Sequence, residues 1–307
     1  MDAGIDLRVT LGRLELPNPV MNASGTFGYG HEWPALTRTR GLGAIVTKTL
    51  TLDARPGNPP PRLHETPAGM LNSIGLENVG VAAFVRDHLP ALRALGRIVI
   101  VSVGGDSPEA YAACVAALEP EAPAAYEINI SCPNIACGGA AFGREPREAA
   151  RVVAAVRGAT RRPLLVKLTP IAGDPIAVAR ACLEAGADAL TAMNTYRGMA
   201  IDVARERPVF ARVTAGLSGP AIRPLALARV WDLARELRCP IVASGGIVTA
   251  HDAAEFLLAG ASAVQLGTAL LRDPARAAGV VDGLERIAAA KNVTRLADLI
   301  MRAQRAE

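Results

Sequence analysis

Eight short apolar runs, separated by helical segments, are the feature that most constrains the fold of this chain. The runs cover residues 19–25, 43–50, 97–105, 124–132, 163–170, 187–194, 240–246 and 262–270. They are nearly continuous in Val, Ile, Leu and Ala, as are parallel strands buried on both faces. Helical segments at 107–119, 144–158, 174–186, 223–237 and 249–260 lie between them, and several begin at a Ser, Asp or Thr cap. Eight such units predict an α/β protein with a closed (β/α)₈ (TIM) barrel.

The rest of the chain adds a hairpin and two insertions to this barrel. Residues 7–19 predict an N-terminal β-hairpin, and long insertions follow strands 2 and 6, at 51–76 and 195–221. The second contains possible strand segments at 201–203 and 209–213. Both leave the carboxyl ends of strands, where barrel enzymes hold their active sites, so we expect binding loops or lids. The 307 residues fit one barrel domain, 1–307. An open doubly wound sheet would usually show an early GxGxxG turn, and none is present.

Composition excludes several classes of partner. No apolar run approaches the ~18 residues of a membrane span. The N-terminus alternates like a strand, with acidic residues at positions 2 and 6, unlike a signal peptide. We therefore expect a cytoplasmic protein without membrane contact. The net charge of +4 is dispersed, which disfavours a nucleic-acid partner, and the five cysteines form neither a disulfide framework nor a paired CxxC motif. We expect reduced thiols and no metal.

Polar residues or glycines stand at the ends of all eight predicted strands. The set is Asn22, Ser24, Lys48, Ser102, Asn129, Ser131, Cys132, Lys167, Thr169, Asn194, Thr195, Ser244, Gly245, Gly246, Gly267 and Thr268. Any one of them could be an ordinary polar cap of a strand. As a set rich in amides and lysines, they predict a ring of hydrogen-bonding groups around the barrel mouth.

The ends of strands seven and eight predict a phosphate site. Ser-Gly-Gly at 244–246 and Gly-Thr at 267–268 occupy the loops with which barrels commonly bind phosphate. Glycines let backbone N–H groups approach the phosphate oxygens, and a following helix N-terminus adds its dipole. A phosphorylated cofactor or substrate is therefore expected.

Lysine is rare in this chain, which makes two lysines conspicuous. Only Lys48, Lys167 and Lys291 are present among 33 basic residues, and the first two lie in apolar strand-like runs. Either could form a Schiff base with a carbonyl substrate, or both could stay charged and bind an anion. The structural alternative for Lys167 is an aliphatic stem in the core with its amine reaching solvent.

The sequence INISCPN, residues 128–134, ends the fourth predicted strand on a thiol. Cys132 is followed by Pro133 and lies at the carboxyl end of a strand, the face where barrel enzymes hold their active sites. Because thiols ionise in mildly alkaline conditions, Cys132 is the candidate proton-abstracting base. No histidine has a comparable position. Cys114, Cys182 and Cys239 are expected to be packing residues. Since Asn129 and Ser131 share one strand face and Cys132 the other, the chain must leave strand geometry at Ser131 or Cys132 for both faces to reach one ligand.

Several sequence segments, in order along nearly the whole chain, are distinctive. They are NASGTFGYG (22–30), GNPPPRLHETPAGMLNSIGLEN (57–78), EINISCPN with GGAAFG (127–143), VKLTP (166–170), AMNTYRGMAID (192–202), GLSGPAIRP (216–224), ASGGI (243–247) and VQLGTAL (264–270). Together they resemble the dihydroorotate dehydrogenase family of flavoenzymes. The segments around residues 194–202 and 216–222 are more similar to its NAD-linked class 1B branch than to the fumarate-using class 1A branch.

The resemblance implies FMN-dependent oxidation of (S)-dihydroorotate to orotate in de novo pyrimidine (UMP) biosynthesis. Cys132 would remove the C5 proton while hydride passes from C6 to N5 of FMN; Lys48 would join it in the catalytic set, and Lys167 would stabilise the reduced ring. The implied FMN-binding residues are Ser24, Lys48, Thr49, Ser102, Asn129, Lys167, Met193, Gly219, Gly245, Gly246, Gly267 and Thr268. The implied substrate-binding residues are Lys48, Asn72, Ser73, Ile74, Gly75, Leu76, Asn129, Asn194 and Thr195.

Two residues depart from the family pattern. Ser102 stands where a flavin-contacting Asn is expected, and Cys137 adds a second thiol near the candidate base. As a thiol near the site, Cys137 could be mistaken for the base or could become oxidised.

The resemblance also implies a partner. In class 1B, electrons reach NAD through an iron-sulfur flavoprotein subunit carrying FAD and [2Fe-2S], and this chain has no cysteine cluster to hold iron and sulfur itself. A homodimer within a heterotetramer is implied. The alternatives are a fumarate-linked dihydroorotate dehydrogenase, a dihydropyrimidine dehydrogenase-like subunit and, more remotely, a Schiff-base lyase. The intact Cys, Asn and Lys set disfavours an inactive scaffold.

Overall fold

The central element of the molecule is an eight-stranded parallel barrel. The computed structural model describes residues 4–32, 41–131 and 142–306. In the sheet, the strand order is β3, β16, β15, β10, β9, β8, β7, β4. The bounds are β3 (Val20–Asn22), β4 (Ile45–Val46), β7 (Val99–Val103), β8 (Ala125–Asn129), β9 (Leu164–Lys167), β10 (Ala189–Ala192), β15 (Ile241–Ser244) and β16 (Ala263–Leu266). A parallel bridge between Met21 and Ala44 joins the first strand to the last, so the sheet closes and the predicted barrel is confirmed.

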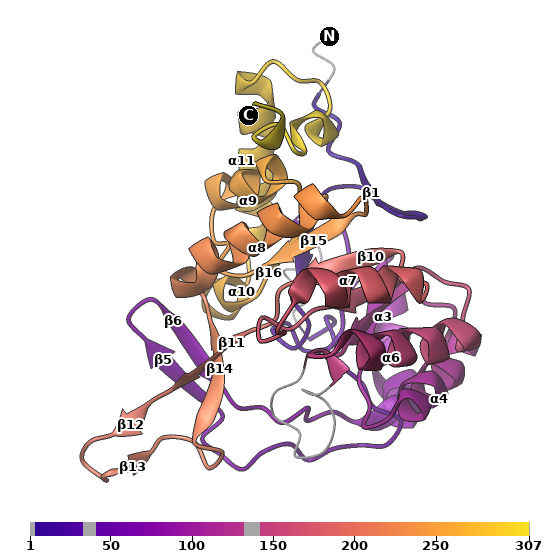
Figure 1. Ribbon diagram of the computed structural model, residues 1–307, viewed down its shortest axis with the longest axis vertical. Helices are drawn as coiled ribbons and strands as arrows, with labels where there is room; N and C mark the ends of the chain where they lie inside the picture. Colours follow the sequence, from indigo (N-terminus) through magenta and orange to yellow (C-terminus); the bar gives the residue numbers. More distant parts are fainter. Residues whose placement is uncertain (1–3, 33–40, 132–141, 307) are drawn as a thin grey trace.

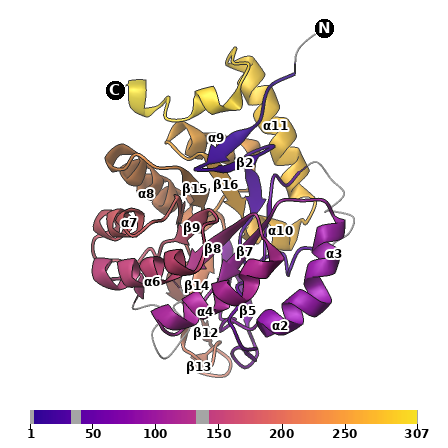
Figure 2. The same cartoon turned by 90° about the vertical axis from the view of Figure 1, so that its right-hand side faces the viewer.

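Helices surround the barrel, as Figures 1 and 2 show. They are α2 (Gly80–Ala83), the π-helical turn η1 (Phe84–His88), α3 (Leu89–Ala94), α4 (Pro108–Leu118), α6 (Pro146–Ala159), α7 (Pro175–Glu184), α8 (Arg223–Glu236), α9 (Ala250–Leu258), α10 (Thr268–Arg272) and α11 (Arg276–Ala290). The predicted caps are present: Ser107, Asp174 and Thr249 accept hydrogen bonds from the first backbone N–H groups of α4, α7 and α9. Within the described residues, no helix is both long and apolar enough to cross a membrane.

A side chain completes the seam where the barrel closes. Asn22 is fully buried; its Nδ2 donates to the carbonyl of Val46 at 2.6 Å, and its Oδ1 accepts from the Val46 N–H at 2.9 Å. The amide of Asn22 thus pairs with β4 as a backbone peptide would. Although the sequence predicts Asn22 in the ring around the mouth, the structure gives it this role in the seam.

The barrel interior is apolar at one end and polar at the other. At the amino ends of the strands, inward-facing residues such as Met21, Ile100 and Leu165 form one buried cluster with the N-terminal hairpin β1 (Val9–Leu11) and β2 (Leu14–Leu16). The predicted hairpin therefore closes the barrel at the amino ends of its strands. Toward the carboxyl ends, buried polar side chains replace the apolar ones, beginning with Glu127 and Gln265.

The two predicted insertions meet in a second, antiparallel sheet. Its strand order is β11 (Tyr196–Met199), β14 (Thr214–Ser218), β6 (Gly69–Asn72) and β5 (Leu63–Thr66), at the lower left of Figure 1. A short pair, β12 (Ile201–Asp202) and β13 (Arg207–Pro208), extends from it. The predicted strand at 201–203 is thus found, but the one at 209–213 is wrong. Phe210 is buried against Leu71 and Ala215 in a small core of its own, so its apolar neighbourhood reflects packing and not a strand.

The predicted strand at 262–270 also needs correction. It ends at Leu266, and Thr268–Arg272 is helix α10. A continuous apolar run does not distinguish a buried strand from a buried helix, and Gly267 separates the two here.

Candidate active site

A pocket lies at the carboxyl ends of the barrel strands, between the barrel and the antiparallel sheet. Predicted residues that line it are Ser24, Lys48, Thr49, Asn72, Ile74, Gly75, Leu76, Asn129, Lys167, Met193, Asn194, Thr195, Gly219, Ser244, Gly245, Gly246, Gly267 and Thr268. They come from distant parts of the sequence, so the structure brings most of the predicted set into one site. Cys132 and Cys137 lie outside the described residues.

Of the implied FMN- and substrate-binding residues that the structure describes, two support the pocket from behind instead of lining it, and Ser131 and Thr169 of the strand-end set also lie outside the lining. Ser102 is fully buried on β7, and its hydroxyl lies 2.9 Å from the hydroxyl of Thr49, which does line the pocket. Ser73 is 2 % exposed and accepts a hydrogen bond from Nδ2 of Asn58 at 3.0 Å. Each serine is therefore positioned to fix a neighbouring loop or side chain.

Glycines form one side of the pocket. Gly245 and Gly246 have φ of 140° and 74°, and a Cβ on Gly246 would lie 2.7 Å from Cβ of Arg223 at the start of α8. Only glycine allows the loop after β15 to lie this close to the helix. On the other side, Thr268 Oγ1 donates to Ser218 Oγ at 2.7 Å. Because α10 has only five residues, the helix dipole expected here is smaller than the sequence suggests.

Lys48 reaches the pocket from the loop after β4. Its Nζ lies 3.3 Å from Oε2 of Glu77, and Arg62 Nη1 lies 2.9 Å from the same oxygen. Burial opposes ionisation of Glu77, but the hydrogen bonds and charges of Arg62 and Lys48 outweigh it, and the pKa of Glu77 lies below its usual value. The amine of Lys48 therefore faces the pocket with one carboxylate already beside it.

Hydrogen bonds fix the amides at the pocket floor. The N–H and hydroxyl of Ser131 donate to Oδ1 of Asn129 at 3.3 and 2.8 Å, while Nδ2 of Asn129 donates to Oγ1 of Thr49 at 3.3 Å. Asn194 donates through Nδ2 to Ser131 Oγ and accepts from the Thr195 N–H at 2.9 Å. Since each amide has defined donor and acceptor neighbours, its orientation is set before a ligand arrives.

The strand that carries Asn129 ends earlier than the sequence predicts. β8 stops at Asn129, and the N–H of Ile130 donates to the carbonyl of Ile128 at 3.2 Å in a tight turn. The chain therefore leaves strand geometry before Ser131 or Cys132, the two predicted positions. This turn is what lets the Ser131 hydroxyl reach back to Asn129.

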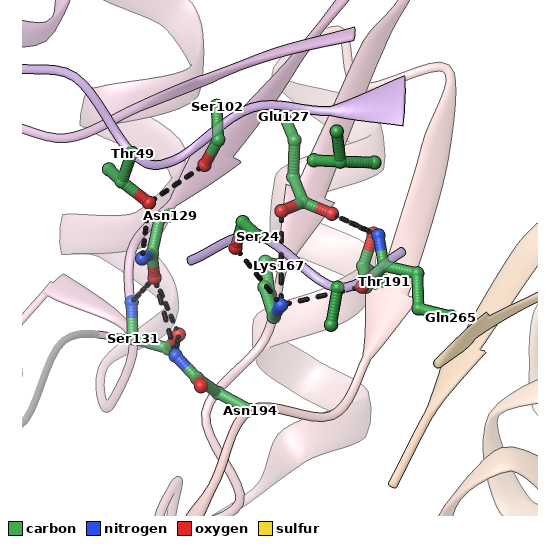
Figure 3. A network of polar contacts seen from close by, with 12 residues as sticks. Ser24, Thr49, Ser102, Glu127, Asn129, Ser131, Lys167, Thr191, Asn194 and Gln265 are labelled. Atoms are coloured by element: carbon green, nitrogen blue, oxygen red, sulfur yellow. Dashed lines mark hydrogen bonds and ion pairs between the residues drawn. The ribbon is translucent and has the colours of Figure 1, made fainter. Parts of the chain in front are cut away.

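Lys167 lies at the bottom of the pocket, inside the barrel. Its side chain is 4 % exposed, which rules out an amine reaching bulk solvent. Figure 3 shows the amine between side chains from β8, β16 and the turn after β3: Nζ donates to Ser24 Oγ at 3.3 Å and Gln265 Oε1 at 3.4 Å, and lies 3.8 Å from Oε1 of Glu127. The three groups around the amine are thus all oxygens, and one of them belongs to a carboxylate.

Three residues of this network escaped the sequence reasoning. Glu127 is fully buried, and its Oε2 accepts from Gln265 Nε2 at 2.6 Å and from Thr191 Oγ1 at 3.1 Å. A signal for Glu127 was present, because a carboxylate in an apolar strand, two residues before Asn129, must face the same side as Asn129. Gln265, an amide in an apolar strand two residues before Gly267, carried a similar signal, whereas Thr191 did not.

Two groups of potential metal ligands occur among the described residues, and neither lines the pocket. One consists of His31, Glu32 and His88; the other includes Asp252. The carboxylate of Glu32 accepts from the N–H groups of Tyr29 and Gly30, and that of Asp252 is paired with Arg223. Their hydrogen bonds give these carboxylates structural roles.

Comparison with known proteins places the chain in a family. Residues 6–288 match the family model described as dihydroorotate dehydrogenase. The chain is 50% identical over 297 residues to a Pelobacter propionicus protein, covering 96% of this chain and 97% of the relative. It is 49% identical over 297 residues to one from Geobacter sulfurreducens, with the same coverage. Both relatives are named dihydroorotate dehydrogenase B (NAD(+)), catalytic subunit. The chain belongs to the dihydroorotate dehydrogenase family.

Proposed function

We propose that this protein oxidises dihydroorotate to orotate in pyrimidine biosynthesis, with FMN bound at the barrel mouth. The observation that carries the proposal is a single pocket that combines a buried cation, Lys167, with a glycine-rich side and a set of oriented amides. Family membership supplies the reaction, and the pocket supplies residues of suitable chemistry.

The donor set fits FMN. The loop of Gly245 and Gly246, with Gly267 and Thr268 opposite, would hold the phosphate, because these backbones can approach an anion closely. Lys167 would face the ring, where a fixed positive charge favours the reduced anionic form. When bound, FMN supplies the acceptor for the hydride that leaves C6 of the substrate.

The substrate would lie against the amides and Lys48. Dihydroorotate carries a carboxylate, which Lys48 can pair with, and amide edges, which Asn72, Asn129 and Asn194 can match as both donors and acceptors. Cys132, outside the described residues, is the proposed base for the C5 proton. Residues 72–76 would hold the substrate from the loop side; Ser73 would act there through its bond with Asn58.

We further propose that electrons reach NAD through a partner subunit. The names of the relatives call each one a catalytic subunit and link it to NAD(+), which supports the proposal. The partner would carry FAD and [2Fe-2S], in a heterotetramer built on a homodimer of this chain. A cytoplasmic location is part of the proposal, since the three cysteines that the structure describes are free thiols, as in reducing compartments.

The observed contacts of Lys167 disfavour the lyase alternative. A Schiff-base lysine must become a neutral nucleophile, whereas Lys167 has a carboxylate and two oxygen acceptors around its amine. Borohydride with a carbonyl substrate would trap a lyase covalently, and we expect no adduct.

The function is tested by anaerobic reduction of the flavin-loaded chain. We expect dihydroorotate to bleach the flavin absorbance and yield one orotate per flavin, with dihydrouracil inactive in the same assay. Fumarate and NAD are then compared as oxidants of the reduced chain; we expect neither to reoxidise it efficiently alone. A flavin that stays oxidised with dihydroorotate would refute the proposal, and bleaching by dihydrouracil would favour the dihydropyrimidine alternative.

A further inference from the structure

Glu127 is a buried carboxylate that the proposed reaction does not use. It is fully buried on β8, does not line the pocket, and lies beneath it among side chains from β9, β10 and β16. A carboxylate buried away from water is costly unless a positive charge and hydrogen bonds compensate it. Its presence there therefore calls for a partner, and Lys167 is the cation paired with it.

The hydrogen bonds between the two charges have a defined direction. Gln265 donates from Nε2 to Oε2 of Glu127 at 2.6 Å and accepts at Oε1 from Nζ of Lys167 at 3.4 Å. The amide can satisfy both neighbours in this orientation only while Glu127 accepts and Lys167 donates. Thr191 adds a second donor to Oε2 at 3.1 Å. This leaves Oε1 of Glu127 with no hydrogen bond and 3.8 Å from the ammonium (Figure 3).

The other lysine of the pocket has a different environment. Lys48 is 22 % exposed, and its carboxylate partner Glu77 is 44 % exposed and shared with Arg62. Water can therefore solvate the amine of Lys48 even when the carboxylate of Glu77 is removed. Of the groups that bond or pair with Lys167, namely Ser24, Gln265 and Glu127, only Glu127 is ionisable. Among the described residues, Glu127 is thus the one ionisable partner given to the amine of Lys167.

We propose that Glu127 is a positioning residue that keeps Lys167 charged and aimed into the pocket, acting directly by its charge and through Gln265. The consequence rests on the proposed function: Glu127 sets how strongly the site stabilises the reduced flavin without touching the flavin. Without its carboxylate, the desolvated amine would lose its proton and with it the stabilising charge.

The rarity of lysine makes a direct test possible. Protein grown with lysine labelled with ¹⁵N at Nζ gives three side-chain signals, one each from Lys48, Lys167 and Lys291. In the oxidised, flavin-loaded protein at neutral pH, we expect an ammonium shift for Lys167. Glu127→Gln should move that signal to the neutral-amine position, while Glu77→Gln, the matched change at the partner of Lys48, leaves it in place. An ammonium shift for Lys167 in Glu127→Gln would overturn the proposal.

The reduction potential of bound FMN gives the second readout. We expect Glu127→Gln to lower the potential, because the amine that faces the ring loses its positive charge. Lys167→Met removes the same charge but leaves the Glu127 carboxylate in place, so it should lower the potential at least as far. If Lys167→Met lowers the potential, an unchanged or raised potential in Glu127→Gln would overturn the proposal. Gln265→Met, which keeps both charges and remains available where Glu127→Gln does not fold, should give an intermediate potential. An unchanged potential in Gln265→Met would remove the bridging role of Gln265. If Lys167→Met itself leaves the potential unchanged, the proposed contact between Lys167 and the flavin is wrong. The ¹⁵N signal of Lys167 in Glu127→Gln then still tests whether Glu127 keeps the lysine charged.

Discussion

At the scale of single residues, the side chains that line the pocket are held in position by neighbours that the ligand would not touch. Ser131 orients Asn129, Ser102 lies behind Thr49, and Glu127 accompanies Lys167. Rotating a free amide or ammonium into position on binding would cost conformational entropy, so prior fixation favours both affinity and catalysis. The supporting residues are therefore as informative as the lining ones.

The thiols provide a prediction at this scale. Burial raises the pKa of Cys114 and Cys182 to about 12 and that of Cys239 to about 11, so all three stay protonated at mildly alkaline pH. Iodoacetamide under these conditions should leave them unmodified in the folded protein, as peptide mass mapping would show. Alkylation should then occur at Cys132, Cys137 or both.

Replacing each candidate thiol separates the base from its neighbour. We expect Cys132→Ala to retain flavin but slow flavin reduction by dihydroorotate roughly 10² to 10⁴-fold, the usual contribution of a general base. Cys137→Ala is the matched control and should reduce at nearly the wild-type rate. Equal losses in the two variants, measured by anaerobic stopped flow, would mean that the base has been assigned to the wrong thiol.

Sequence reasoning found most of the lining residues but missed Glu127, Thr191 and Gln265 behind them, for a physical reason. The carboxyl ends of parallel strands meet at one mouth, so a polar residue at a strand end can be assigned to the site from its position alone. Supports depend on pairings across the barrel, such as Glu127 with Thr191 and Gln265, which are 64 and 138 residues away in sequence. Nothing local to these residues specifies those pairings.

At the scale of elements, the barrel closes through a seam that is weaker in backbone hydrogen bonds than the other strand pairs. β4 has two residues, and β3 meets it by a single bridge supplemented by the Asn22 side chain. The eight strands could be predicted because helices cover them and make each one continuously apolar. The role of Asn22 in the seam could not be predicted, because the sequence around an asparagine at a strand end is the same whether its side chain faces a ligand or a neighbouring strand.

The seam predicts a specific loss of stability. Asn22→Ala leaves the buried N–H and C=O of Val46 without partners and should lower the free energy of unfolding by about 3 kcal/mol. Asn22→Asp keeps an acceptor for the N–H but sets an oxygen against the Val46 carbonyl, so it should be no better than alanine. Urea unfolding measures both variants, and wild-type stability in either would show that the backbone bridge alone closes the barrel.

At the scale of the whole molecule, two insertions far apart in sequence combine over one pocket. β6 from the first insertion pairs with β14 from the second, which places Asn72 opposite Gly216. The sequence indicated that both loops leave the catalytic face, yet their joint sheet follows from a pairing across 144 residues that no local pattern encodes. The substrate contacts proposed for both loops therefore depend on this sheet.

Gly216 is where that dependence can be measured. A Cβ there would lie 2.2 Å from Oγ1 of Thr195 and 3.3 Å from Nδ2 of Asn72, so Gly216→Ala must displace proposed substrate contacts from both insertions. We expect KM for dihydroorotate to rise roughly tenfold, about 1.4 kcal/mol of binding, with flavin content unchanged. Gly158→Ala on α6, where a Cβ meets nothing within 4 Å, is the matched control and should leave KM unaltered. A Gly216→Ala protein that lost flavin while keeping its KM would instead place the sheet over the cofactor.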